Sequence, residues 1–193
     1  MLLSVSGPQG TGKSTVLASL EKDFGINIIP NKTSRSILAD WNTTLTEVNS
    51  NIDTTYKFQK EIIKRHREND MMYMESDKIW IKERSYLDIF IYALNILGPH
   101  NRYSTFINEY FEECKQYQSA YDCVIYLTGR KDYVPEDDGV RSTNKLFVQM
   151  IDNSMQYFSK PFDTGNMIYI DASDHNKRIE LITNHIECIR GIC

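Results

Sequence analysis

The sequence has few cysteines, no long apolar run and no excess of positive charge, and each shortage excludes a class of protein. Its four cysteines form no Cys-x-x-Cys pair, so we expect no metal or disulfide chemistry and interpret them as free thiols in a reducing compartment: Cys114, Cys123, Cys188 and Cys193. No stretch approaches the roughly 20 apolar residues that span a bilayer. Residues 1–5 are too short for the core of a secretory signal. We therefore expect a cytoplasmic protein with no membrane partner.

The overall charge and the length limit the partners and the number of domains. The formal net charge is −4 and the isoelectric point is near 5.6. An acidic surface does not favour duplex nucleic acid, although a local basic cleft can hold a small anion. Since chains usually divide only beyond roughly 250 residues, we expect residues 1–193 to form one domain. The four histidines have no spacing typical of a metal site or a catalytic triad.

A dense glycine cluster lies near the start of the chain. Gly7, Gly12, Lys13 and Ser14 match the spacing Gly-x-x-x-x-Gly-Lys-Ser, directly after an apolar run and before a stretch compatible with a helix. In such a loop the backbone N–H groups surround phosphates, the lysine reaches the outer phosphates, and the serine binds magnesium. The pattern predicts a site for ATP or GTP with Mg²⁺, rather than a glycine-rich turn that binds nothing. The expected nucleotide-binding residues are Gly7, Gln9, Gly10, Thr11, Gly12, Lys13, Ser14 and Thr15.

Apolar runs alternate with amphipathic stretches along the rest of the chain. The predicted strands are 2–6, 26–29, 78–82, 123–127 and 167–170. The predicted helices are 13–23, 33–38, 53–68 capped by Asp53 or Thr54, 85–97, 103–117, 146–158 and 179–189 capped by Ser173 or Asp174, with 45–51 left open. The alternation predicts an α/β fold of the P-loop NTPase type, with a mostly parallel five-stranded sheet between two layers of helices. Ligands in such sheets bind beyond the carboxyl ends of the strands.

Charged residues follow the predicted strand 78–82. Glu83 stands where P-loop proteins place an acidic group near magnesium, and Arg84 can neutralise a phosphate or orient an acceptor hydroxyl. A surface ion pair is the alternative interpretation. Asp88 lies three residues after Ser85, so it can be either a capping-box partner or a substrate ligand.

Two short motifs extend this pattern to a family. Phe58-Gln59 on a predicted helix, followed by Glu83-Arg84-Ser85 after a strand, resembles the deoxynucleoside kinases. The resemblance implies that Gln59 recognises the base and Phe58 packs against it, and it places Glu83 and Arg84 at the metal and acceptor region. An amide suits this role because it presents a donor and an acceptor side by side.

A second resemblance is to ribosylnicotinamide kinases and phage nucleotide kinases. It is carried by the phosphate loop and by the stretch 135–142, Pro-Glu-Asp-Asp-Gly-Val-Arg-Ser. The segment 128–142 lacks periodicity and has the length of a functional loop. We expect it to act as a lid in which Arg130, Lys131 and Arg141 close over the transferring phosphoryl group. The acidic run that ends at Asp138 then pairs with arginines, approaches the metal or accepts hydrogen bonds from sugar hydroxyls.

The acceptor is left between a nucleoside and a nucleoside monophosphate. Deoxynucleoside kinases carry an acidic base just after the second strand, whereas here no carboxylate occurs between Pro30 and Asp40. A phosphate acceptor needs no base, so this gap, with Arg35 and Arg84 available, favours a monophosphate. The sequence therefore predicts an ATP- and Mg²⁺-dependent nucleoside or nucleotide kinase, with ribosylnicotinamide kinase as the near alternative.

A nucleotide-dependent switch or binding module is the alternative from another class. A GTPase would need the guanine-reading Asn-Lys-x-Asp, and the related run 144–147 lacks its aspartate. The oligomeric state is left open, with a homodimer as one option.

Overall fold

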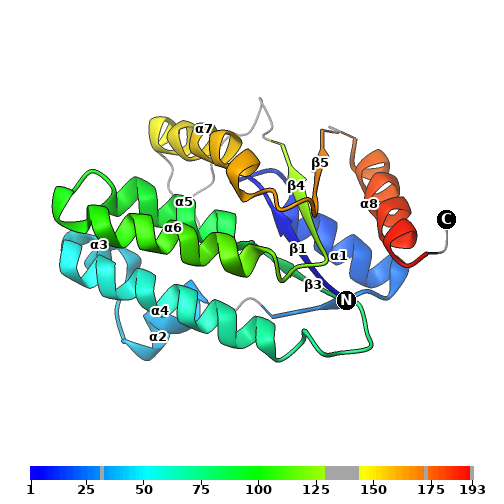
Figure 1. The fold of residues 1–193 in the computed structure, drawn as a ribbon, viewed down its shortest axis with the longest axis horizontal. Coiled ribbons are helices and arrows are strands. Elements are labelled where there is room, and N and C mark those ends of the chain that lie inside the picture. The colour runs from blue at the N-terminus through cyan, green and yellow to red at the C-terminus, as the bar shows by residue number, and fades with distance from the viewer. Residues whose placement is uncertain (31–32, 129–143, 172–173, 192–193) are drawn as a thin grey trace.

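A computed structural model of the protein (Figure 1) describes residues 1–30, 33–128, 144–171 and 174–191. A single five-stranded sheet forms its centre, in the spatial order β2-β3-β1-β4-β5, and every neighbouring pair of strands is parallel. The strands are β1 (Leu2–Ser6), β2 (Asn27–Ile28), β3 (Trp80–Glu83), β4 (Cys123–Leu127) and β5 (Met167–Ile170). The predicted α/β architecture is confirmed, and the central strand β1 carries the glycine-rich loop at its carboxyl end.

Helices cover both faces of the sheet. They are α1 (Lys13–Phe24), α2 (Ser34–Asp40), α3 (Leu45–Ser50), α4 (Ile52–Met71), α5 (Tyr86–Leu97), α6 (Ser104–Gln118), α7 (Lys145–Phe162) and α8 (His175–Ile189), with a 3₁₀ turn over Asn101–Tyr103. Alternate residues of β1 explain the two layers: Leu2 belongs to the apolar core under α4–α7, whereas Leu3 and Val5 belong to the core under α1 and α8. Figure 1 shows α1 and α8 together on one side of the sheet.

Several boundaries differ from those expected. Helix α4 is capped by Asn51, whose side chain accepts hydrogen bonds from the N–H groups of Asp53 and Thr54, so the predicted cap at Asp53 or Thr54 is wrong. The stretch 45–51, which the sequence leaves open, forms α3 over Leu45–Ser50, and Thr44 and Glu47 make a reciprocal capping box at its start. Strand β2 keeps only two of the four predicted residues.

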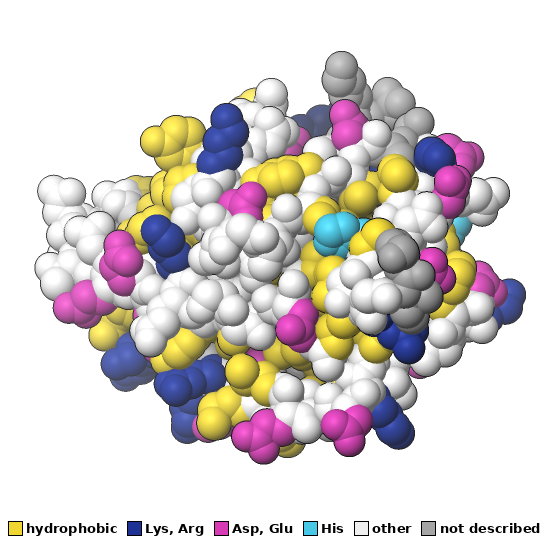
Figure 2. All heavy atoms as spheres, turned by 45° about the vertical axis from the view of Figure 1, so that its right-hand side comes forward, with side chains coloured by type: hydrophobic (Ala, Val, Ile, Leu, Met, Phe, Trp, Pro, Cys, Tyr) yellow, Lys and Arg dark blue, Asp and Glu magenta, His cyan; other side chains and the backbone are white. Residues whose placement is uncertain are grey.

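The structure bears on the cysteines and on the apolar segments. Cys114 and Cys123 are free and buried, but Cys188 is disulfide-bonded, so the expectation of four free thiols is wrong for that residue. Within the described ranges, no helix is long and apolar enough to cross a membrane. Acidic and basic side chains both occur across the face shown in Figure 2.

Candidate active site

The loop between β1 and α1 has the backbone that its glycines predict. Gly7, Gly10 and Gly12 have φ angles of 136°, 81° and 84°, values that residues with a Cβ rarely adopt. Gly7 also lies against β4: a Cβ built there would be 2.3 Å from the carbonyl oxygen of Leu127. The start of the loop therefore depends on glycine for close approach as well as for conformation.

Lys13 lies inside the curve of this loop. Its Nζ donates hydrogen bonds to the carbonyl oxygens of Gly7 at 2.8 Å and of Pro8 at 2.9 Å, and the side chain is buried. The loop is further closed by Thr11, whose hydroxyl donates to the Pro8 oxygen at 2.9 Å. Gln9 and Gly10 are half-buried, and Thr15 is exposed in the first turn of α1. The ammonium group is thus held within the loop at the point where the motif needs it.

Ser14 meets Glu83 at the carboxyl edge of the sheet. The Ser14 hydroxyl donates to Oε2 of Glu83 at 2.9 Å, across 69 residues of sequence. Ser14 is exposed and Glu83 half-buried, and the contact between them lies in an exposed part of the structure. A hydroxyl and a carboxylate are the hard oxygen ligands that Mg²⁺ prefers, and two protein ligands leave room for waters and phosphates. The predicted metal ligands are therefore side by side, and their chemistry fits magnesium.

Asp88 lies in the first turn of α5, where three donors converge on its Oδ2. The hydroxyl of Ser6 is at 2.6 Å, the backbone N–H of Ser85 at 2.9 Å and the Ser85 hydroxyl at 3.2 Å. The side chain is almost fully buried. The capping-box interpretation is confirmed, and the contact with Ser6 ties the start of α5 to the end of β1. A role for Asp88 as a substrate ligand stays a prediction.

Arg84 follows β3 with an unusual backbone. Its φ is 74°, in the left-handed region that non-glycine residues avoid. The guanidinium carbon lies 5.1 Å from the centre of the Tyr92 ring. Burial opposes its charge, but Tyr92, Asp88 and Glu83 outweigh this and raise the pKa of Arg84, so the residue stays charged. A strained backbone that aims a cation beside Glu83 is typical of a functional turn.

The Phe58-Gln59 pair is buried on α4. Phe58 packs in a small apolar cluster with residues of α2 and α3, and its ring meets Trp41 edge-on at 5.8 Å. Gln59 is only 3% exposed, and its Oε1 has no hydrogen-bond partner. Burying an amide oxygen without a partner is costly, so this atom marks a place where a ligand group would be favourable.

The other residues predicted to bind the acceptor substrate or the transferring phosphoryl group lie in different settings. Arg35 is exposed in the first turn of α2. Asp40 at the end of α2 pairs with Arg65 of α4 at 2.5 Å, so this carboxylate is engaged by a neighbouring helix. The predicted lid over 128–142, with Arg130, Asp138 and Arg141, lies outside the described residues apart from its first position.

Comparison with protein families decides the assignment. The family model described as "AAA domain" matches residues 3–154, which is most of the chain and includes the phosphate loop, Gln59 and Glu83. The chain belongs to this AAA domain family. No curated protein matches the sequence.

Three solved structures share the fold of this AAA domain. Deoxyadenosine kinase from M. mycoides with bound dATP is 19% identical with a TM-score of 0.71, covering 97% of this chain and 100% of that one. NadR protein in complex with NR is 11% identical with a TM-score of 0.69; this chain is covered fully but spans only 52% of NadR. Shikimate kinase from Aquifex aeolicus is 14% identical with a TM-score of 0.58, covering 97% and 96%. At these identities the likeness establishes the P-loop kinase fold.

Sequence patterns missed two features of this chain. Arg178 of α8 reaches the phosphate loop, where its Nη1 donates to the Thr11 oxygen at 2.5 Å.

The second feature is a buried network between α4 and β3. An ion pair joins Lys82 of β3 to Asp70 of α4, and the Tyr121 hydroxyl donates to the same carboxylate at 2.8 Å. His66 lies 3.0 Å from the Tyr121 oxygen. Burial, with Lys82 and Arg84 nearby, holds the pKa of His66 well below its ordinary value. This network fixes α4 against β3. It joins different parts of the chain, so no local sequence pattern predicts the contacts.

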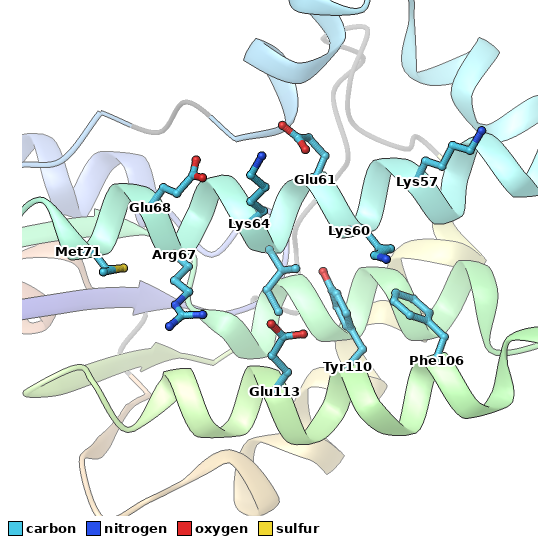
Figure 3. Close-up of a pocket in the computed structure, with 11 residues that line it drawn as sticks. Lys57, Lys60, Glu61, Lys64, Arg67, Glu68, Met71, Phe106, Tyr110 and Glu113 are labelled. Carbon is cyan, nitrogen blue, oxygen red and sulfur yellow. The ribbon is translucent and has the colours of Figure 1, made fainter.

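A groove of about 680 Å³ lies elsewhere on the AAA domain, between α4 and α6 (Figure 3). Lys60 and Arg67 from α4 face Phe106, Tyr110 and Glu113 from α6 in this view. All its lining residues come from these two helices. The groove is therefore separate from the phosphate loop and is not the nucleotide site.

Proposed function

We propose that the protein is an ATP-dependent phosphotransferase that moves the γ-phosphoryl group to a (deoxy)nucleoside monophosphate or (deoxy)nucleoside. The observation that carries the proposal is the meeting of Ser14 and Glu83 at 2.9 Å beside the phosphate loop. P-loop proteins hold Mg²⁺ with a hydroxyl of the loop and a strand-end carboxylate, so this pair supports a site for Mg-nucleotide. Together with Arg84 in its strained turn, this arrangement supports transfer rather than simple binding or switching.

The residues of the chain act by positioning and by charge neutralisation. The loop N–H groups and Lys13 hold the phosphates, while Ser14 and Glu83 would hold Mg²⁺. The metal, when bound, neutralises charge that develops on the phosphate oxygens. Arg84 balances charge on the acceptor side. Arg130 and Arg141 are proposed to complete the charge balance from the loop after β4.

Gln59 and Phe58 support a base-containing acceptor. The unpartnered Oε1 of Gln59 is more than nine-tenths buried on α4. A nucleobase edge supplies the donor that this oxygen lacks, and the amide NH₂ can donate in return. The deoxyadenosine kinase of the same fold, with bound dATP, agrees with such a ligand.

A monophosphate is favoured over a nucleoside as acceptor. No carboxylate occurs between Pro30 and Asp40, and Asp40 itself is paired with Arg65. A phosphate oxygen is already anionic and needs no base, and Arg35 of α2 is proposed to bind that phosphate. Ribosylnicotinamide is the alternative acceptor, since NadR in complex with NR has the same fold.

An acceptor panel tests the function. We expect ADP to form from ATP and Mg²⁺ only when a nucleoside monophosphate or nucleoside is added, with one base preferred. The measurement is coupled detection of ADP across mixed nucleotides, nucleosides and ribosylnicotinamide, with no acceptor as the blank. If ADP formed at the same rate whichever acceptor was added, the kinase proposal would fail and a switch or ATPase would replace it.

Gln59→Ala is expected to raise the acceptor KM by about five- to a hundredfold and to relax base choice. The physical reason is that an unpaired base edge in a buried site costs about 1–3 kcal/mol. The KM for ATP should hardly change. Steady-state kinetics with two bases measures both effects, and Gln116→Ala, an exposed glutamine on α6, is the matched control. Unchanged acceptor KM and base preference would leave Gln59 with a packing role only.

A further inference from the structure

The C-terminal helix α8 is attached to the phosphate loop by a buried arginine. Arg178 lies in the first turn of α8 and is 5% exposed. Its Nη1 is 2.5 Å from the carbonyl oxygen of Thr11, and a Cβ built on Gly12 would be 3.4 Å from the same nitrogen. A second contact lies nearby, where His175 Nε2 is 2.9 Å from the Ser19 hydroxyl of α1. The guanidinium group therefore packs directly against the backbone of the Thr11–Gly12 peptide.

The contact fixes the direction of a phosphate-binding N–H group. The chain has no cis peptide bonds in its described part, so the Thr11 carbonyl and the Gly12 N–H point in opposite directions. Because Arg178 draws the carbonyl toward α8, the Gly12 N–H is aimed away from α8. A cation on the carbonyl also polarises the peptide and makes its N–H a stronger donor.

The cost of placing a cation at this position indicates that the positive charge of Arg178 has a role. A cation in the first turn of a helix is opposed by the helix dipole, and burying a charge costs free energy. A neutral donor could satisfy the Thr11 carbonyl without these penalties. A cation can also attract the negative charge of the phosphates, which a neutral donor cannot do, because only one peptide separates the guanidinium group from the position that the phosphates would take.

We propose that Arg178 is a positioning residue of the nucleotide site, which orients the Thr11–Gly12 peptide and adds a fixed positive charge behind the phosphate loop. This rests on the proposed function, because the ligand it serves is the triphosphate of ATP. It makes α8 part of the nucleotide site, although the phosphate loop lies more than 160 residues earlier in the chain.

Direct binding of ATP tests the proposal. We expect Arg178→Met to weaken the affinity for Mg-ATP at least tenfold, measured by calorimetry on the full chain, and to reduce the rise in Tm that saturating ATP produces. In kinetics the KM for ATP should rise while the acceptor KM stays near its original value. Lys177→Met is the matched control, because Lys177 is in the same turn but pairs with Glu180 at 3.0 Å on the exposed side. It should leave ATP affinity unchanged.

The outcomes separate this proposal from the wider one. Wild-type protein that bound no ATP would overturn both proposals. If the wild type bound ATP and Arg178→Met bound it equally well, with only a lower Tm, Arg178 would have a structural role. The kinase proposal would then still stand. If Arg178→Met does not fold, Arg178→Gln takes its place, since it keeps a donor for Thr11 without the charge. If Arg178→Gln bound ATP as tightly as the wild type does, the proposed role of the positive charge would be overturned.

Discussion

Replacing Lys13 with alanine is expected to lower kcat/KM at least a thousandfold while the protein stays folded. The ammonium group lies inside the phosphate loop, bonded to the carbonyl oxygens of Gly7 and Pro8. A thousandfold loss corresponds to about 4 kcal/mol of transition-state stabilisation, which is reasonable for the charge that meets the transferring phosphoryl group. Losing its bonds to the loop should cost about 1 kcal/mol of unfolding free energy. Steady-state kinetics and thermal unfolding measure the two effects.

Lys22→Ala is the control for this variant. Lys22 is an exposed lysine in the last turn of the same helix, so its removal changes the net charge equally without touching the loop. It should retain full activity. A Lys13→Ala protein that kept its rate would contradict the assignment of the phosphate loop, and one that lost its fold would show that Lys13 is needed for packing.

Gly7→Ala is expected to destabilise the protein by about 3 kcal/mol or more and to abolish ATP binding. The new Cβ would be 2.3 Å from the Leu127 oxygen, which is backbone and cannot rotate away, so β1 and β4 must separate at their carboxyl ends. The φ of 136° adds strain for any residue with a Cβ. Chemical denaturation gives the change in unfolding free energy, and calorimetry gives the binding.

Gly25→Ala distinguishes the close contact from the backbone angle. Gly25 caps α1 with a φ of 65°, but a Cβ there would meet nothing within 4 Å. Its replacement should cost only about 1 kcal/mol and leave ATP binding intact. Equal losses from the two variants would mean that conformation alone, and not the approach of β4, requires glycine at position 7.

The sequence predicted those parts of the site that have a local signature. The phosphate loop and the carboxylate at the end of β3 follow fixed spacing or strand periodicity, and both lie where they were expected. The cap of α4 was placed two or three residues late, because asparagine, aspartate and threonine all suit that position and only the geometry selects Asn51. Arg178 and the Asp70–Lys82 pair could not be predicted, because each depends on contacts between elements whose relative position no local pattern fixes.

The central place of β1 has a consequence for how the protein folds. Its neighbours in the sheet begin at Trp80 and Cys123, so the strand that carries the phosphate loop pairs only with segments far along the chain. Such non-local pairing must overcome the entropy of closing long loops and slows folding. During synthesis β1 is therefore made well before either of the strands with which it pairs. A nucleotide that binds only the finished loop would then favour the native state by mass action, so its concentration in the cell would affect the yield of folded protein.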